Sequence, residues 1–379
     1  MPATRDAGRA HVMGTTKVAA RSTVFEVDVL DPRTAAEPEG WSGFRRRAKL
    51  WPVWEYDVLR REAWMAKNPA VLAVLRRNGT IVGAFTVMVC RSWRAGDFAP
   101  LSVFGGRFRP RWAEAYLWQL SGYPAGVLDE RLDEAERRQV VRRFEQALCA
   151  HLGPGLLGLI YRAMNPELLP ALEGRGRMSR EIDPAAVLSN EYSTVDDWER
   201  ALGDETRKTL HELRADGDLR TEAATARRDL DCHELAVLLN AHRSRQDDRA
   251  WAGGQRSRFG GLHMDTRSPI APSYLDALIR RPDVLTRTYR DGSGRLLGFG
   301  TVFDADDGCA LHQWAALPSA AGGRKGLYVD FYARGVEHMI THRRPELTAG
   351  RAMLENKTPL GFGTRSLVSV AVPRPVLGR

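Results

Sequence analysis

The chain has 379 residues, 43% of them hydrophobic, and a formal net charge of +9 at pH 7. This length suits two domains of ordinary size, and no uncharged apolar run reaches the length that a membrane span needs. The four cysteines lack CxxC or Cys/His ligand spacing, which argues against a disulfide framework or a zinc site and favours reduced thiols in a cytoplasmic protein.

Residues 1–22 are predicted to form a disordered tail. This tail lacks the hydrophobic segment of a secretory signal. A strand is expected over 23–29 and a helix over 57–66. Two apolar runs then flank Asn78-Gly79, the strongest short signal for a β-hairpin. Apolar spacing on one face predicts a long helix over 129–152. After it, a strand is expected over 156–161, a helix over 166–172 and a strand over 185–189.

The second half repeats this order of elements. Thr194, with Asp197 three residues later, predicts a capped helix start. A second hairpin is expected around residues 291–294, and the other elements are expected as helices 205–214, 230–242 and 273–279 and strands 284–289, 296–303, 310–315 and 367–372. Because helix, hairpin, helix and strand occur twice, the sequence predicts an α/β fold of two tandem domains, residues 23–180 and 181–379, each with a mixed, mostly antiparallel sheet flanked by helices.

A glycine-rich turn precedes a predicted helix near the C-terminal end of the chain. Gly322, Gly323 and Gly326 allow backbone N–H groups to approach an anion at the helix start. Arg324 and Lys325 stand between these glycines and add positive charge. The turn is therefore a candidate site for the phosphate of a donor substrate; the alternative is a mobile turn with two solvated cations.

This part of the chain resembles the last third of a GNAT-type acyltransferase domain, in particular the FemAB-like and peptidoglycan-biosynthesis/recognition branch. The motifs that carry the resemblance are LYVDFY at 327–332, EHMI at 337–340, and Glu355-x-Lys357 followed by Gly361-Phe362. The resemblance implies tandem GNAT-like domains and transfer of an acyl or aminoacyl group onto an amine, with the catalytic cleft in the C-terminal domain.

The resemblance also suggests roles for single residues. Lys357 matches a lysine that meets donor phosphate or developing negative charge; the alternative is a surface lysine in a loop. Tyr332 matches a tyrosine that gives a proton to the leaving group, although a half-buried helix aromatic is the better interpretation of this position. Glu355 and Asp330 are further candidate catalytic residues, although Asp330 also suits an ordinary helix position. Acetyl-CoA enzymes of this family carry Q/R-x-x-G-x-G/A at the glycine turn; a match starting at Arg324 would require glycine where Leu327 stands, so ordinary CoA binding is in doubt.

The expected partners follow from the charge and the resemblance. Arg207, Lys208 and Arg214 have helical spacing and form a candidate RNA contact, with a solvated helix face as the alternative. The leading hypothesis is a transferase with aminoacyl-tRNA as co-substrate, no tightly bound cofactor, and a cell-wall precursor or small-molecule amine as acceptor. The alternatives are an acyl-CoA-dependent N-acyltransferase and a non-catalytic binding protein on a GNAT scaffold. No metal site is expected, because His338 and His342 lack an HExxH pattern.

Overall fold

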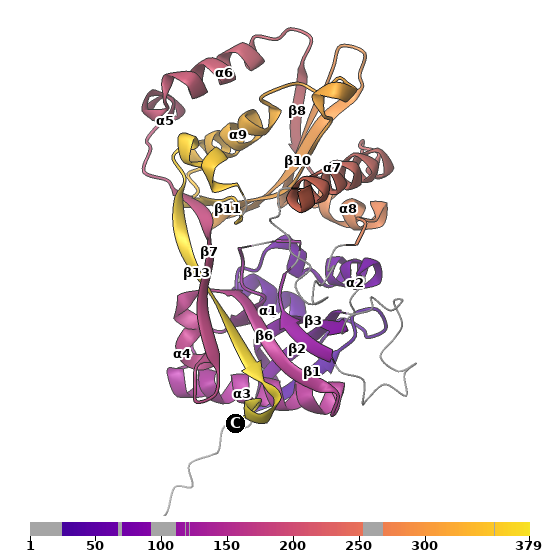
Figure 1. The fold of residues 1–379 in the computed structure, drawn as a ribbon, viewed down its shortest axis with the longest axis vertical. Helices are drawn as coiled ribbons and strands as arrows, with labels where there is room; N and C mark the ends of the chain where they lie inside the picture. The colour runs from indigo at the N-terminus through magenta and orange to yellow at the C-terminus, as the bar shows by residue number, and fades with distance from the viewer. Residues whose placement is uncertain are drawn as a thin grey trace, which may run out of the picture.

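The computed structural model describes residues 25–66, 70–91, 111–117, 119–120, 122–252, 268–351 and 353–379. The predicted tail of residues 1–22 lies outside these ranges. The strands of the described residues form one 13-stranded sheet with the order β1-β2-β3-β4-β6-β13-β7-β12-β11-β10-β9-β8, and β5 pairs with β3 (Figure 1). All neighbouring strands run antiparallel except the pairs β4–β6 and β11–β12, which confirms the predicted mixed, mostly antiparallel sheet flanked by helices.

The two halves have the same order of elements. The first half contains β1 (Phe25–Leu30), α1 (Trp41–Arg47), α2 (Tyr56–Met65), β2 (Ala70–Arg77), β3 (Thr80–Arg91), β4 (Arg111–Ala115), β5 (Gly126–Leu128), α3 (Glu134–Leu152), β6 (Leu156–Met164), α4 (Leu169–Leu172) and β7 (Met178–Ser189). The second half contains α5 (Val195–Ala201), α6 (Asp204–Arg214), β8 (Arg220–Thr225), α7 (Cys232–Ala252), α8 (Pro272–Ile279), β9 (Val284–Arg290), β10 (Leu296–Ala305), β11 (Gly308–Ala316), α9 (Leu327–Thr341), β12 (Glu346–Thr348) and β13 (Gly363–Pro373). A strand, two helices, an antiparallel meander, a helix and a parallel strand thus occur twice.

The halves exchange their last strands. β13 lies between β6 and β7, and β7 lies between β13 and β12. Figure 1 shows both strands running from one half to the other. The predicted boundary between residues 180 and 181 therefore falls inside β7, and the sheet passes from one half to the other without a break.

The local turn signals place several elements correctly. The Asn78-Gly79 hairpin and the 291–294 hairpin are confirmed by the antiparallel pairs β2–β3 and β9–β10. The predicted helix 129–152 begins later, at Glu134, because the Asp133 side chain accepts a hydrogen bond from the Glu136 N–H and caps the helix. Several elements are longer than expected: α7 continues to Ala252, β7 already begins at Met178, and β13 already begins at Gly363.

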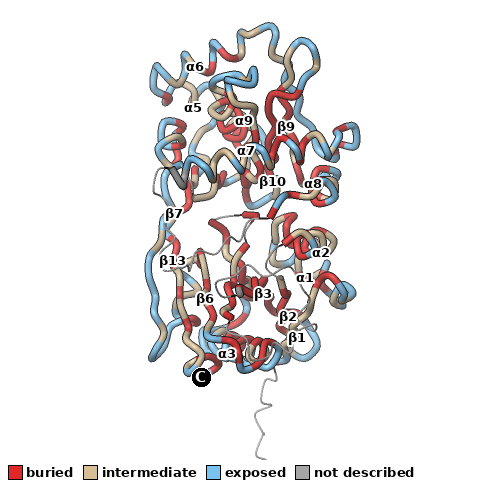
Figure 2. The backbone as a smooth tube through the Cα atoms, turned by 45° about the vertical axis from the view of Figure 1, so that its right-hand side comes forward, coloured by how far each residue is buried: buried red, intermediate tan, exposed pale blue. Residues whose placement is uncertain are grey.

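Aromatic rings pack in the core of both halves. Phe85 stacks on Phe144 at a centroid distance of 4.4 Å in the first half, and Trp314 stacks on Phe331 at 5.0 Å in the second. α9 can approach β10 closely because Gly300 has no side chain. A Cβ atom at this position would lie 2.3 Å from the Phe331 ring. Figure 2 shows the buried residues concentrated along the strands and the helix faces that cover them. None of the helices in the described ranges has the length and apolar character that crossing a bilayer requires.

Candidate functional site

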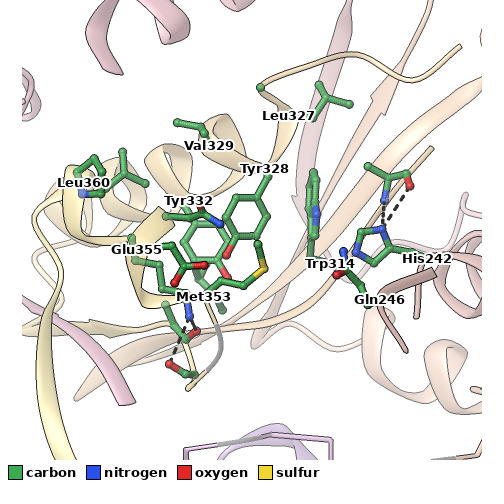
Figure 3. Close-up of a pocket in the computed structure, with 18 of the residues that line it drawn as sticks. His242, Gln246, Trp314, Leu327, Tyr328, Val329, Tyr332, Met353, Glu355 and Leu360 are labelled. Carbon is green, nitrogen blue, oxygen red and sulfur yellow. Dashed lines mark hydrogen bonds between the residues drawn. The ribbon is translucent and has the colours of Figure 1, made fainter. Parts of the chain in front are cut away.

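A cavity of about 970 Å³ lies in the second half, where β11 and α9 face the loop that follows β12. α6 and α7 supply further walls, and Gln119 and Leu120 reach the cavity from the first half. Figure 3 shows Tyr328, Tyr332, Met353 and Glu355 on one side, and Trp314, His242 and Gln246 on the other.

The cavity opens where β11 and β12 separate. These parallel strands pair only at Cys309–Leu347 and Ala310–Thr348, although β11 continues to Ala316. Beyond this pairing, residues of β11 and of the segment after β12 both line the cavity. The corresponding strands of the first half, β4 and β6, instead stay paired from Arg111 to Ala115. The β11–β12 pair therefore presents a backbone edge to this cavity.

The N-terminus of α9 also faces this cavity. Gly326 is the N-cap residue, with φ of 86° and no side-chain cap, and the first intrahelical hydrogen bond runs from the Asp330 N–H to the Gly326 carbonyl. The N–H groups of residues 327–329 therefore lack intrahelical partners, and these residues line the cavity. The equivalent helix α3 is closed by the Asp133–Glu136 capping box. Of the two helices, α9 is the one that offers free amides to an anion.

Lys357 is buried at the point where the strands separate. Its Nζ donates to the carbonyl oxygens of Ala349, at 2.5 Å, and Gly350, at 3.4 Å, and lies 5.7 Å from the centroid of the Tyr332 ring. Burial lowers the pKa of Lys357 to about 8, while the nearby Glu355 carboxylate acts in the opposite direction. Lys357 thus gives hydrogen bonds to carbonyls that follow the end of the β11–β12 pairing, which stabilises the separated strands.

Two tyrosines connect Lys357 with the middle of the cavity. The rings of Tyr328 and Tyr332 lie 4.3 Å apart, and a hydrogen bond joins their side chains. Burial raises the pKa of Tyr328 to about 12. Tyr328 therefore keeps its proton near neutral pH and remains available as a hydrogen-bond donor.

The α7 wall is positively charged. The Arg245 Nη2 donates to the Ala316 carbonyl at 2.7 Å, and within the described part of the chain neither Arg245 nor Arg249 has a carboxylate within ion-pair distance. Burial lowers the pKa of the neighbouring His242, and both arginines add to this effect. The end of β11 nearest α7 is therefore an electropositive region close to the free amides of α9.

The structure brings together part of the predicted site. Lys357, Tyr332, Glu355, Arg324 and Gly326 all line this one cavity. The predicted residues that do not line it are Gly322, Gly323, Lys325, Asp330, Arg207, Lys208 and Arg214.

The glycine turn serves packing as well as the cavity. A Cβ atom at Gly323 would lie 2.0 Å from the Leu317 carbonyl oxygen, so no larger residue fits there. Arg324 forms ion pairs with Asp218 at 2.7 Å and with Asp216 at 3.6 Å. Its guanidinium therefore already has two carboxylate partners.

Asp330 and Arg214 belong to an ion-pair network behind the cavity. Asp330 is 2% exposed and accepts hydrogen bonds from the Arg214 Nε at 3.0 Å and the Tyr289 hydroxyl at 2.9 Å. Arg214 also pairs with Glu199 and Glu337. These contacts give both residues a role in attaching α6 to α9.

Arg207 and Lys208 lie on α6, next to residues of that helix that line the cavity. Arg207 pairs with Asp204, and the Lys208 Nζ lies 3.8 Å from a Glu212 carboxylate oxygen. Each predicted RNA-contacting cation of this pair thus has an acidic neighbour on its own helix, as a solvated helix face commonly does.

Sequence reasoning did not identify several residues of the cavity. Tyr328 stands four positions before Tyr332, so the i, i+4 spacing in the LYVDFY motif was a usable signal. Arg245, Arg249 and Gln119 come from segments far from the motif, and no local pattern connects them with it.

One cluster of possible metal ligands lies outside the cavity lining. Single ligand atoms of Asp304, Cys309 and His338 lie within 4.8 Å of one another. The Asp304 carboxylate accepts a hydrogen bond of 2.7 Å from the Arg344 Nε and lies 3.1 Å from the His338 Nε2. Because Asp304 already has cationic or polar partners, these contacts explain the cluster without an ion.

Comparisons with known proteins give a match only at the level of structure. No family model and no curated protein matches the sequence. FemX has 8% identity and a TM-score of 0.53, over 91% of this chain and 96% of that one. The C-terminal domain of a putative lysylphosphatidylglycerol synthetase from Agrobacterium fabrum has 11% identity and a TM-score of 0.52, over 83% and 86%.

A conserved protein of unknown function from Bacteroides thetaiotaomicron has 11% identity and a TM-score of 0.51, over 92% of this chain and 100% of that one. These likenesses extend over nearly the whole of each protein, including both halves of the sheet. The chain therefore shares the fold of FemX and of the lysylphosphatidylglycerol synthetase domain, and this likeness fits the GNAT-type fold that the LYVDFY and Glu355-x-Lys357 motifs predict.

Proposed function

We propose that this protein is an amide-forming acyltransferase that moves an aminoacyl group from an aminoacyl-tRNA to an amine acceptor. The observation that carries the proposal is the separation of β11 from β12, because it places a free strand edge, the Tyr328 hydroxyl and the Glu355 carboxylate around one cavity. The likeness to FemX supports the fold on which this chemistry is proposed. The name of the Agrobacterium neighbour describes a lysyl group joined to phosphatidylglycerol, which agrees with aminoacyl transfer.

The proposed reaction has a defined place for each proton. The amine nitrogen attacks the ester carbonyl, the new C–N bond forms, and the C–O bond to the ribose of the tRNA breaks. Glu355 takes the proton that the amine loses, and Tyr328 gives a proton to the leaving oxygen. Backbone N–H groups on the free edge of β11 stabilise the oxyanion. Lys357 keeps the strands apart and adds positive charge near their separation.

The donor is proposed to bind with its phosphates at the electropositive end of the cavity, near Arg245, Arg249 and the N-terminus of α9. Arg324 is not assigned to the donor phosphates, because its guanidinium already pairs with Asp216 and Asp218. The acceptor is proposed to be a small-molecule or cell-wall precursor amine.

A second candidate function is acyl-CoA-dependent N-acylation. The free amides of residues 327–329 favour it, because a helix N-terminus without a side-chain cap suits a pyrophosphate. A donor screen distinguishes the two candidates. Purified protein is incubated with a mixture of candidate amine acceptors. One reaction contains charged tRNAs that carry radiolabelled amino acids, and the other contains labelled acyl-CoAs.

We expect the charged tRNAs to give a labelled product. This product should keep its label after mild alkaline treatment, which hydrolyses esters but not amides. A product only from acyl-CoA would replace the leading proposal by the second candidate. If neither donor class gives an amide, the enzyme proposal is wrong and a binding protein on this scaffold becomes the better interpretation.

The proton-transfer roles are tested by removing single atoms. We expect Y328F and E355Q each to lower kcat by roughly 10² to 10⁴, the range typical of a lost general acid or base, with little change in the thermal midpoint. Y192F, which removes a hydroxyl from a half-buried tyrosine outside the cavity lining, is the matched control. Rates within about twofold of the unsubstituted protein for both variants would contradict these roles.

A further inference from the structure

Met353 presents an apolar side chain to the cavity from a strained backbone position. Its φ of 57° and ψ of 50° lie in the left-handed region, which a residue with a side chain adopts only at a cost in energy. The side chain is 43% exposed. Of the large hydrophobic residues that are exposed in the described part of the chain, Met353 is the one that lines this cavity. The loop after β12 thus holds an apolar group at the cavity instead of packing it into the core.

Trp314 on β11 forms the opposite wall. Its indole ring stacks on Phe331 at a centroid distance of 5.0 Å. The rings of Tyr289 and Tyr328 each lie 6.0 Å from it in edge-to-face arrangements. These neighbours fix the indole, and Figure 3 shows it across the cavity from Met353. Trp314 is half-buried and lines the cavity, so it gives this wall a fixed aromatic surface.

The space between Met353 and Trp314, called the apolar gap below, adjoins the groups that are proposed to transfer protons. Figure 3 shows the Met353 side chain pointing past Tyr328 toward Trp314. Glu355 stands two residues after Met353 on the same loop and lines the same cavity. A thioether and an aromatic ring carry no charge, so they favour an apolar ligand group over a polar one.

The position of the apolar gap selects one part of the two substrates. In the proposed reaction Tyr328 gives a proton to the leaving oxygen of the donor, so the reacting ester lies at its hydroxyl. An aminoacyl side chain is joined to the carbon next to the reacting carbonyl and therefore also lies close to Tyr328. The acceptor amine reaches this carbonyl from Glu355, and the rest of the acceptor extends away from it. The group that occupies the apolar gap is therefore the side chain of the donor.

We infer that Met353 and Trp314 select the donor by the side chain of its aminoacyl group, and this inference rests on the proposed amide-forming function. A large apolar side chain leaves water when it enters the apolar gap, which favours its binding. An asparaginyl side chain has nearly the shape of a leucyl side chain, but its amide loses hydrogen bonds with water there. The donor class is therefore an aminoacyl group with a large apolar side chain, such as leucyl, methionyl or phenylalanyl.

The test uses two trinucleotides with the C-C-A sequence that ends a tRNA, one with leucine and one with asparagine joined to the 3′ position. An amide replaces the reactive ester, so binding is measured without transfer. Affinities are measured by calorimetry with the full-length protein, M353Q and M178Q. M353Q keeps the side-chain length and adds a polar amide. M178Q is the matched control, because Met178 is 61% exposed and lies outside the cavity lining.

We expect the unsubstituted protein and M178Q to bind the leucyl analogue roughly tenfold more tightly than the asparaginyl analogue. M353Q is expected to bring this ratio to within about twofold, because the new amide can pair with asparagine and loses hydration beside leucine. The C-C-A trinucleotide without an amino acid should bind equally to all three proteins, since Met353 is assigned to the side chain and not to the phosphates.

Equal ratios in the unsubstituted protein and M353Q overturn the inference, and so does the absence of binding by both analogues. It also falls if M353Q changes the choice of acceptor in the donor screen while the two analogues keep their ratio, since the apolar gap would then hold the acceptor. The donor screen reports separately on the reaction. A leucyl preference that depends on Met353, without any amide product, would overturn the proposed function and leave the apolar gap as a binding site.

Discussion

At the scale of single residues, Lys357 has an environment that differs strongly from that of an ordinary lysine. It is 1% exposed, it donates to two backbone carbonyls, and its pKa is lowered to about 8 from an ordinary value of 10.5. An ammonium that is surrounded by carbonyl dipoles and an aromatic ring loses part of its hydration but keeps favourable contacts. Lys357 is thus both a structural tie and a titratable group at the candidate site.

This shift predicts a pH dependence of stability. Between about pH 8 and 10.5 the unfolded chain binds a proton at Lys357 that the native state has lost, so the free energy of unfolding gains a positive slope with pH. The difference between the unsubstituted protein and K357M should therefore increase from pH 8 to pH 10, measured by urea unfolding. K325M, at an exposed lysine, controls for the loss of a lysine as such. A difference that is constant over this range would show that Lys357 is not desolvated.

At the scale of elements, the contrast between α9 and α3 decides where an anion can bind. The two helices occupy equivalent places in the repeat, but Asp133 and Glu136 close the N-terminus of α3 while Gly326 leaves that of α9 open. The helix macrodipole attracts negative charge to this N-terminus as well, and the acidic residue of the first turn, Asp330, is buried and paired with Arg214.

A negative charge in the first turn of α9 should act on the donor and not on the fold. We expect V329D to raise the KM of the donor at least about tenfold, because the carboxylate competes with phosphate for the free amides, while the dipole favours the substituted helix. V329N has nearly the same shape and loses the same apolar contacts, so it isolates the effect of charge. An equal donor KM for V329D and V329N would place the phosphates elsewhere.

Local signals predict elements better than they predict the site. Asn78-Gly79 sets its hairpin through φ values that few residues adopt, so two letters suffice. β8 was not predicted, because its sequence RTEAAT has no apolar face and all of its residues are exposed at the sheet edge. The site residues between Arg324 and Lys357 lie in one contiguous segment with recognisable motifs, so the sequence predicts them. Gln119 and Arg245 enter the cavity through contacts between distant segments, which no short pattern encodes.

At the scale of the whole molecule, one buried ion pair ties the C-terminal end of the chain to the first half. The Arg177 Nη2 lies 2.7 Å from the Glu145 Oε2, and Glu145 is fully buried. Glu145 also accepts hydrogen bonds from the Tyr161 hydroxyl and from the Gly378 N–H. α3, β6, the segment before β7 and the segment after β13 thus meet at one carboxylate.

Removing the cation from this pair should destabilise the whole sheet. We expect R177M to lower the free energy of unfolding by roughly 3 to 5 kcal/mol, because it leaves a buried carboxylate without its charged partner. R138M, which breaks an exposed i, i+4 pair with Glu134, should cost no more than about 0.5 kcal/mol. Urea unfolding monitored in both halves measures the two effects. Similar costs for the two variants would show that Glu145 is hydrated or protonated.

The exchange of β7 and β13 has a consequence for synthesis on the ribosome. Strand β6 needs residues 363–373 as its neighbour, so the first half leaves the exit tunnel with an unfilled place in its sheet. If that half folds during synthesis, it forms an intermediate in which β6 has an open edge. Such an edge is a site for misassembly with other nascent chains. We therefore expect arrested chains that end before residue 363 to recruit chaperones, and release of the full sequence to remove that requirement.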